Sequence, residues 1–148
     1  MRETVKLQVF KATRARLPIS RLRRLFELVA RREGRTRLPG QINLIICSDA
    51  HIRGLNREFR GIDRATDVLS FNLDSTRGTD QVQGELYISA PYTRRQAFRL
   101  SRGVYDEYLF LFCHGLLHLF GHDHDTVKRE RAMFALQERY LKALGSRG

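Results

Sequence analysis

One segment restricts the possible folds of this chain more than any other. Residues 105–120, YDEYLFLFCHGLLHLF, read as one long helix, and Gly121 predicts where that helix ends. A surface helix keeps a polar face, whereas this one is apolar nearly all round. Its apolar positions are Leu109, Phe110, Leu111, Phe112, Leu116, Leu117, Leu119 and Phe120. We therefore expect this helix to be buried.

Four shorter segments have the pattern of β-strands. The first alternates polar and apolar residues, and the second is a continuous apolar run with β-branched members. The four predicted strands cover residues 4–10, 41–47, 68–73 and 84–89. The polar residues between the last two strands, 74–83, predict a loop or a hairpin connection.

Four further segments predict helices. Apolar residues fall on one face of residues 19–33, Ser48 can cap a short helix that follows it, and Ser89 with Pro91 is typical of another helix start. The last helix spans about 126–144 and ends at Gly145. The order β-α-β-α-β-β-α-α-α predicts an α/β (α+β) fold, with one mixed sheet of about four strands and about five helices. The length of 148 residues fits a single domain over 1–148.

The net charge of +11 is concentrated at the two ends of the chain. Residues 1–40 carry +9 (12 basic, 3 acidic), residues 41–125 carry −2 (9 basic, 11 acidic) and residues 126–148 carry +4 (6 basic, 2 acidic). Arginine supplies 23 of the 27 basic residues, and its planar guanidinium matches phosphate geometry. This pattern favours a nucleic-acid partner over arginines that merely face solvent.

Cysteines and hydropathy indicate the compartment. Cys47 and Cys113 both lie in apolar runs, which favours buried reduced thiols over a disulfide. The N-terminal residues MRETVKLQVF lack the apolar block of a signal peptide, and no stretch approaches the ~20 apolar residues of a membrane span. We expect a cytoplasmic protein without a membrane partner.

Histidines cluster at the end of the long helix, in HGLLHLFGHDH. His114 and His118 are four residues apart, so both imidazoles can reach one metal ion at ~2.1 Å. His122 would lie roughly 12 Å from His114 along a continuous helix, at ~1.5 Å per residue. Because Gly121 ends the helix, either His122 or His124 could be the third ligand, and the spacing favours His124.

A site with three protein ligands leaves a fourth position for water, which is typical of catalytic zinc. Such a metal lowers the pKa of its water to about 7. The alternative is that each histidine is a core residue with a hydrogen-bond partner. Three histidines at this spacing, followed by a terminating glycine, favour the metal site.

Gly115 occupies the position of the catalytic glutamate in the metalloprotease pattern H-E-x-x-H-x-x-G-x-x-H. Peptide hydrolysis needs that general base, whereas a phosphodiester can be cleaved with metal chemistry and positive charge on its oxygens. Upstream, Arg53, Arg57, Arg60 and Arg64 recur at helical or turn spacing, and one of them near the metal could bind a phosphate through two hydrogen bonds. The missing glutamate and the positive charge both favour phosphate ester cleavage.

Four motifs together resemble the YbeY family, over about residues 42–144. They are L-N-x-x-[FY]-R-x(5)-T-D-V-L-S-F at 55–71, G-E-L-Y-I-S at 84–89, H-G-x-L-H-L-x-G-H-D-H at 114–124 and M-x(4)-E at 133–138. The resemblance implies zinc ligands at His114, His118 and His124, with His122 not among them, and one Zn²⁺ per chain. It also implies a functional arginine at Arg60. Glu85 departs from the family, which more usually has aspartate there.

The resemblance further implies a single-strand-specific endoribonuclease that matures the 3′ end of 16S rRNA and acts in ribosome quality control. The implied partners are rRNA of the small ribosomal subunit, a small-subunit ribosomal protein and an Era-type GTPase. Two alternatives are a ribosome-assembly RNA-binding factor with a structural zinc site and a metzincin-like protease. A site of three histidines also accepts nickel, cobalt or copper.

Overall fold

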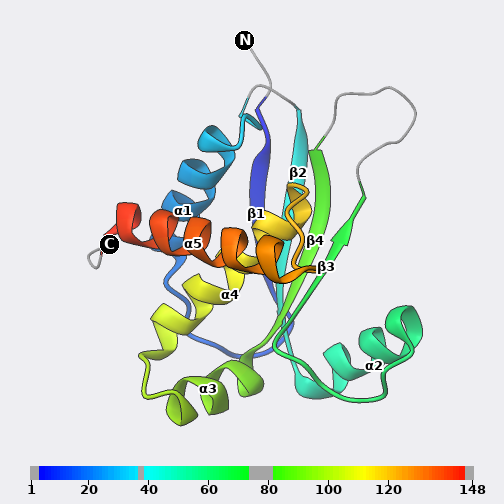
Figure 1. Cartoon of the computed structure of the whole chain (residues 1–148). Coiled ribbons are helices and arrows are strands. Elements are labelled where there is room, and N and C mark those ends of the chain that lie inside the picture. Colours follow the sequence, from blue (N-terminus) through cyan, green and yellow to red (C-terminus); the bar gives the residue numbers. More distant parts are fainter. Residues whose placement is uncertain (1–3, 37–38, 74–81, 146–148) are drawn as a thin grey trace.

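The computed structural model describes residues 4–36, 39–73 and 82–145 (Figure 1). Its elements are β1 (Lys6–Lys11), α1 (Ile19–Arg32), β2 (Gly40–Cys47), α2 (Asp49–Arg60), β3 (Val68–Asn72), β4 (Val82–Ser89), α3 (Ala90–Arg99), α4 (Val104–Leu119) and α5 (Val127–Leu144). The predicted order of strands and helices is confirmed. Of the connection predicted at 74–83, residues 74–81 lie outside the described residues, and Val82 and Gln83 belong to β4 instead, because β4 extends the pairing with β2 to Val82 and Gln83.

The strands form one mixed sheet in the order β1-β2-β4-β3. β1 pairs with β2, and β2 with β4, in parallel, whereas β3 runs antiparallel to β4 along the edge. The mixed four-stranded sheet expected from the sequence is therefore present. Since β3 is an edge strand, its outer side is free to border a cavity.

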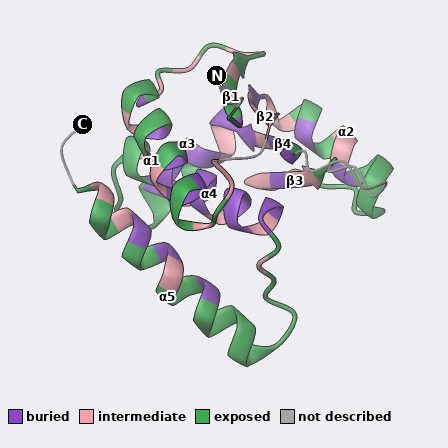
Figure 2. Cartoon of the chain, turned by 90° about the horizontal axis from the view of Figure 1, so that it is seen from above, coloured by how far each residue is buried: buried purple, intermediate pink, exposed green. Residues whose placement is uncertain are grey.

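Helix α4 lies inside the fold, against the sheet and among α1, α3 and α5 (Figures 1 and 2). Ten of its residues are buried, which confirms the enclosure predicted from its apolar composition. Alternate residues of β2 show the two faces of the sheet: Leu44 packs into the core around α4, and Ile45 packs with α2 on the other face. Only two apolar clusters are present among the described residues, and the one around α4 is the larger.

The predicted helix starts and ends are also observed. The Ser48 side chain accepts a hydrogen bond from the His51 amide (3.1 Å), and Ser89 accepts one from the Tyr92 amide (3.3 Å). Gly121 follows α4 with a φ of 98°, a backbone conformation that favours glycine.

Both cysteines are buried free thiols, as expected, and burial raises the pKa of Cys47 to about 11 and that of Cys113 to about 12. Within the described ranges, none of the helices has the length and the apolar character needed to cross a membrane.

Candidate metal centre

Three histidines meet at the C-terminal end of α4. His114 and His118 project from successive turns of the helix, and His124 comes from the segment between α4 and α5. One ligand nitrogen from each ring lies within 4.8 Å of the other two. The ring centroids are 4.9 Å apart for His114–His118, 4.7 Å for His118–His124 and 5.7 Å for His114–His124. The spacing argument predicted this grouping, and the three side chains could hold one metal ion.

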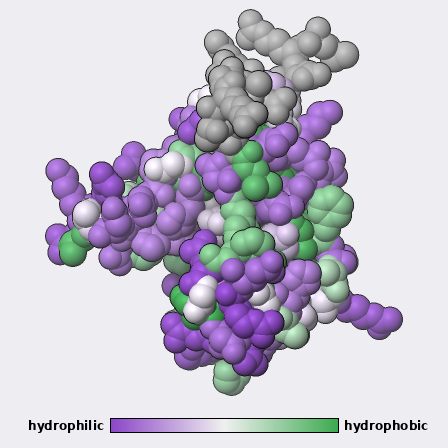
Figure 3. Space-filling view, turned by 90° about the vertical axis from the view of Figure 1, so that its right-hand side faces the viewer, coloured by the Kyte–Doolittle hydropathy of each residue, from purple (hydrophilic) through white to green (hydrophobic). Residues whose placement is uncertain are grey.

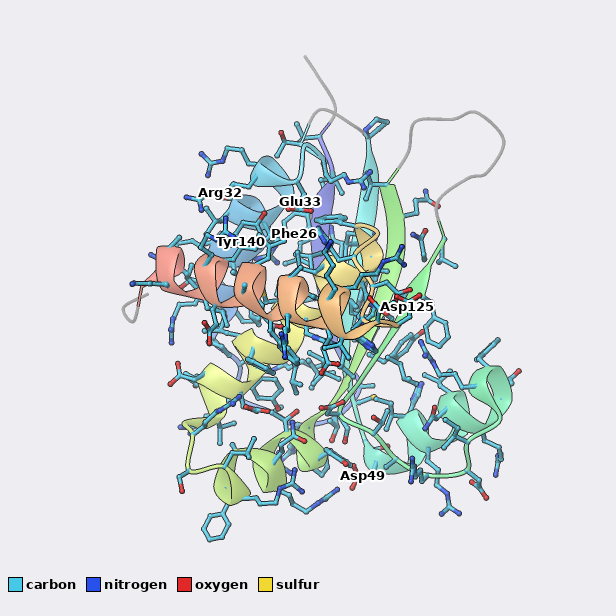
Figure 4. All side chains as sticks on the ribbon, viewed as in Figure 1. Phe26, Arg32, Glu33, Asp49, Asp125 and Tyr140 are labelled. Carbon is cyan, nitrogen blue, oxygen red and sulfur yellow. The ribbon has the colours of Figure 1, made fainter. Side chains whose placement is uncertain are left out.

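The turn after α4 separates His122 from His124. The His122 amide donates to the Leu117 carbonyl (3.0 Å), and its imidazole Nε2 lies 2.5 Å from a carboxylate oxygen of Glu33. The other Glu33 oxygen accepts a hydrogen bond from the Tyr140 hydroxyl. Glu33 follows the last residue of α1 and Tyr140 belongs to α5, so this bond joins the two helices (Figure 4). The His122 imidazole is thus held by Glu33 at the end of α1, and His124 is the third histidine of the candidate metal site.

The chemistry of the three side chains fits a metal such as zinc. Burial lowers the pKa of His114, and burial with the neighbouring histidines lowers that of His118 to about 4. Both imidazoles are therefore neutral at pH 7, which is the form that binds metal. Neutral imidazole nitrogens are ligands that zinc accepts at ~2.0–2.1 Å.

Gln137 of α5 selects the tautomer of His114. Its amide nitrogen donates to the Phe110 carbonyl (2.8 Å), so its carbonyl oxygen faces His114 Nδ1 at 3.4 Å. That oxygen can only accept, hence Nδ1 carries the proton and Nε2 keeps the lone pair for a metal. The side chain of Gln137 is fully buried. The sequence motif at 133–138 included this position only as an unspecified residue.

The histidines open into a cavity of about 630 Å³. Arg60, from the last turn of α2, lines the same cavity and donates to the Ser70 carbonyl at 3.3 Å. Arg53 and Arg57, by contrast, pair with Asp63 at 2.9 and 3.9 Å and do not line it. Of the recurring arginines on α2, Arg60 is therefore the one that lies beside the histidines.

Asp67 places a carboxylate in this cavity that sequence reasoning missed. Asp67 immediately precedes β3 and lines the cavity. One of its carboxylate oxygens accepts a hydrogen bond from the backbone amide of Val68 at 2.7 Å, and the other accepts one from the side-chain amide of Gln96 at 3.2 Å. Gln96 also donates to the fully buried Glu107 (2.7 Å), which pairs with Arg102 at 2.9 Å. The sequence showed Asp67 only as part of a loop that leads into a strand, because its partners come from α3 and α4.

Gly115 faces the sheet at close range. A β-carbon built on it would lie 2.6 Å from Leu86 Cδ2 and 3.3 Å from Val68 Cγ2. A glutamate there would have to displace the Leu86 and Val68 side chains, so packing as well as chemistry opposes the protease pattern at this position.

Glu85 lies away from the cavity. Its carboxylate accepts a hydrogen bond from the Tyr87 hydroxyl at 3.1 Å, and in the sheet it is in register with Asn43 and Phe71. Leu86, the next residue, points instead toward α4, so Glu85 projects from the opposite face of the sheet.

Comparisons with known proteins identify the family of this chain. The family model described as Endoribonuclease YbeY matches residues 9–145. The chain is 38% identical over 138 residues to the Endoribonuclease YbeY of Moorella thermoacetica, with 87% of this chain and 88% of the relative covered. It is 35% identical over 134 residues to that of Halalkalibacterium halodurans, with 84% of each chain covered.

Among solved structures, the solution structure of a Thermotoga maritima protein matches with a TM-score of 0.64 and 29% identity. The match covers 93% of this chain and 88% of the other. The fold, the histidine motif and the relatives lead to one assignment: the chain belongs to the YbeY endoribonuclease family.

Proposed function

We propose that this chain is a zinc-dependent, single-strand-specific endoribonuclease that hydrolyses RNA phosphodiesters within a single domain. The observation that carries the proposal is the shared cavity, which is lined by His114, His118 and His124 and by Arg60. His114, His118 and His124 are the proposed ligands of one zinc ion. Zinc would supply Lewis acidity to a phosphoryl oxygen and to a water molecule.

Arg60 provides the positive charge that the reaction needs. As the P–O ester bond breaks, negative charge collects on the phosphoryl oxygens, and a guanidinium can donate two hydrogen bonds to them. Arg60 is exposed at the rim, so a phosphate of the RNA backbone can reach it.

Asp67 is suited to move the proton. Attack on phosphorus by water, or by a ribose 2′-hydroxyl, releases a proton, and the leaving oxygen takes one up. Asp67 lines the same cavity, and the hydrogen bonds from the Val68 amide and Gln96 fix the direction of its carboxylate. The carboxylate missing at Gly115 is therefore supplied from another element.

We expect Asp67→Asn to lower kcat for RNA cutting roughly 10²- to 10⁴-fold, because asparagine keeps the size of the side chain and can still accept from the Val68 amide, but it loses the base. The bound zinc should be unchanged. Asp63→Asn is the matched control, since Asp63 is exposed and pairs with Arg53 outside the cavity. A cutting rate within about twofold of wild type for Asp67→Asn would exclude the proton-transfer role.

The family resemblance and the basic ends of the chain support the biological proposal. The substrate is the rRNA of the small ribosomal subunit, in maturation of the 16S 3′ end and in ribosome quality control, within the cytoplasm. A small-subunit ribosomal protein and an Era-type GTPase are the proposed partners. Residues 1–40 and 126–148, with +9 and +4, would hold the RNA backbone.

A cleavage assay on single-stranded RNA tests the activity. Zinc-loaded wild type should cut, and Arg60→Ala and His118→Ala should not, with folding checked by circular dichroism. Arg57→Ala, one turn earlier on α2, and His51→Ala, an exposed histidine, are the matched controls and should cut normally. If the wild type binds rRNA without cutting it, and zinc removal unfolds it, the chain is an assembly factor with structural zinc.

A further inference from the structure

We propose that the apolar part of the cavity beside the histidines is a subsite for one unpaired nucleobase, with the ring of Phe134 as its stacking surface. This inference rests on the proposed function, and it names the part of the RNA that the site recognises. The phosphate next to that nucleotide would lie at the histidines and Arg60.

The cavity lining has a polar part and an apolar part. The polar part comprises Arg60, Asp67, Ser70, Asp123 and the three histidines. The apolar part includes Phe110 and Leu111, which lie on α4 one turn before His114, a rise of about 6 Å along the helix. A nucleotide has the same division, because its phosphate is charged and the faces of its base are apolar.

Phe134 comes from α5, which crosses in front of α4 (Figure 1). Its ring centroid lies 6.5 Å from that of His114, with an angle of 31° between the ring planes. The ring therefore stands beside His114 and lines the same cavity.

The exposure of Phe134 is not explained by packing. Its side chain is 43% exposed, whereas its α5 neighbours Met133 and Gln137 are 2% and 0% exposed. Within the described residues, Phe134 is also the only exposed large apolar side chain that lines this cavity. Exposed aromatic rings in grooves with positive charge are what proteins use to stack bases of single strands, and Phe134 lines the same cavity as Arg60.

In this proposal, Phe110 is the second aromatic residue that the base would contact. It lines both this cavity and the neighbouring one, and the Arg102 guanidinium lies 4.6 Å from its ring centroid. Arg102 is in turn paired with the buried Glu107, so the Phe110 ring is held from behind. A base that enters between Phe110 and Phe134 has to be unstacked from its neighbours, and a base-paired one cannot enter. The subsite thus accounts for a preference for single strands.

The test uses the full zinc-loaded chain and an end-labelled single-stranded oligoadenylate. Copies of the oligonucleotide carry one abasic nucleotide, placed at each position in turn. We would measure kcat/KM for cutting, affinity by fluorescence polarisation read before cutting proceeds, and bound zinc. The variants are Phe134→Ala, which removes the ring, and Phe134→Tyr, which keeps it. Phe98→Ala is the control, because Phe98 is 89% exposed on α3 and does not line the cavity.

We expect Phe134→Ala to lower kcat/KM and affinity about tenfold, with Phe134→Tyr and Phe98→Ala close to wild type. One abasic position should cause a similar loss in the wild type and no further loss in Phe134→Ala, because both changes remove the same contact. Bound zinc should be equal in all variants.

Two results would overturn the subsite. The first is a Phe134→Ala variant with wild-type kcat/KM and affinity. The second is that, at every abasic position, the loss from the abasic nucleotide and the loss from Phe134→Ala multiply, as they do for independent contacts. Loss of zinc from Phe134→Ala would also overturn it, because the ring would then support the histidines. If the wild type binds the oligonucleotide without cutting it, the proposed function fails, and the affinities alone decide the subsite. If the wild type does not bind it, both proposals are wrong.

Discussion

Gly115 lies where α4 packs against the sheet, and a β-carbon there would overlap neighbouring side chains. Its nearest neighbours are the methyl groups of the fully buried Leu86 and of Val68, at 2.6 and 3.3 Å from the ideal Cβ position. A close contact with buried side chains is relieved only by shifting the packed core. The same approach of helix and sheet brings His114 and His118 to the border of β3 and its preceding loop.

We expect Gly115→Ala to lower the free energy of unfolding by about 1 kcal/mol in urea denaturation. Overpacking costs about 1–3 kcal/mol, and alanine's better helix propensity offsets about 1 kcal/mol of it. Gly54→Ala is the matched control on α2, since a β-carbon there meets nothing within 4 Å. It should stabilise the protein by up to about 1 kcal/mol. Changes of the same sign in both variants would contradict the steric explanation.

Gln137 supports the metal site through one hydrogen bond to His114. Gln137→Leu removes the acceptor for Nδ1–H and leaves the imidazole free to rotate, so we expect zinc affinity to fall about 10- to 100-fold. Competition with a chromophoric chelator would measure it. Met133→Leu, another buried change on the same face of α5, should leave the affinity unaltered. Equal affinities in Gln137→Leu and wild type would show that the bond does not orient the ligand.

At the level of elements, the turn between α4 and α5 is anchored to the end of α1. Glu33 accepts from Tyr140 and lies 2.5 Å from His122, and the Arg35 guanidinium donates to the Phe120 carbonyl at 3.0 Å. These contacts hold the turn on both sides of Gly121. His124 follows two residues later, so its position depends on a helix that begins about a hundred residues earlier in the chain.

We expect Glu33→Ala to weaken zinc binding about tenfold and to lower the free energy of unfolding by about 1–3 kcal/mol, because it leaves His122 and Tyr140 without their acceptor. Isothermal titration with zinc and urea denaturation of the metal-free protein measure the two effects. Glu27→Ala, an exposed glutamate of the same helix, is the control. Unchanged zinc affinity in Glu33→Ala would show that the contacts of Glu33 with His122 and Tyr140 do not position the metal ligands.

On the scale of the whole molecule, the two basic ends of the sequence become neighbours. α1 and α5 contact each other over the outside of α4 (Figures 1 and 2). Most of the exposed residues of these two helices are polar. On the side of the molecule that faces the viewer in Figure 3, hydrophilic residues predominate and hydrophobic ones gather along the middle. Positive charge from two distant parts of the chain can therefore act on one RNA strand.

RNA affinity should fall steeply with salt, and Arg31→Gln or Arg131→Gln should make the dependence shallower. Both are exposed arginines, on α1 and α5. Each lost phosphate contact should flatten the slope of log affinity against log salt by about 0.7 for a single strand. Arg95→Gln is the control, since Arg95 pairs with Asp49 at 2.8 Å on the far helix α3. Identical slopes in all variants would place the RNA elsewhere.

The sequence by itself determined the elements, the enclosure of α4 and the pairing of His114 with His118. These follow from apolar periodicity, caps and i, i+4 spacing, which act over a few residues. Because Gly121 ends the helix, either His122 or His124 remained possible as the third ligand, and the x-x-G-x-x-H spacing favoured His124.

Only the tertiary structure decided what surrounds the histidines. Arg60 and Phe134 line the cavity from α2 and α5, and Asp67 lines it from the residue before β3. Gln137 of α5 and Glu33, which follows α1, contact His114 and His122 instead. The motif at 55–71 contains Arg60 and Asp67, but no local pattern shows that these side chains lie beside the histidines, because that arrangement arises where α4 packs against the edge of the sheet and α5 crosses it. The physical reason is that close packing sets distances between elements, whereas periodicity sets only which face of each element is buried.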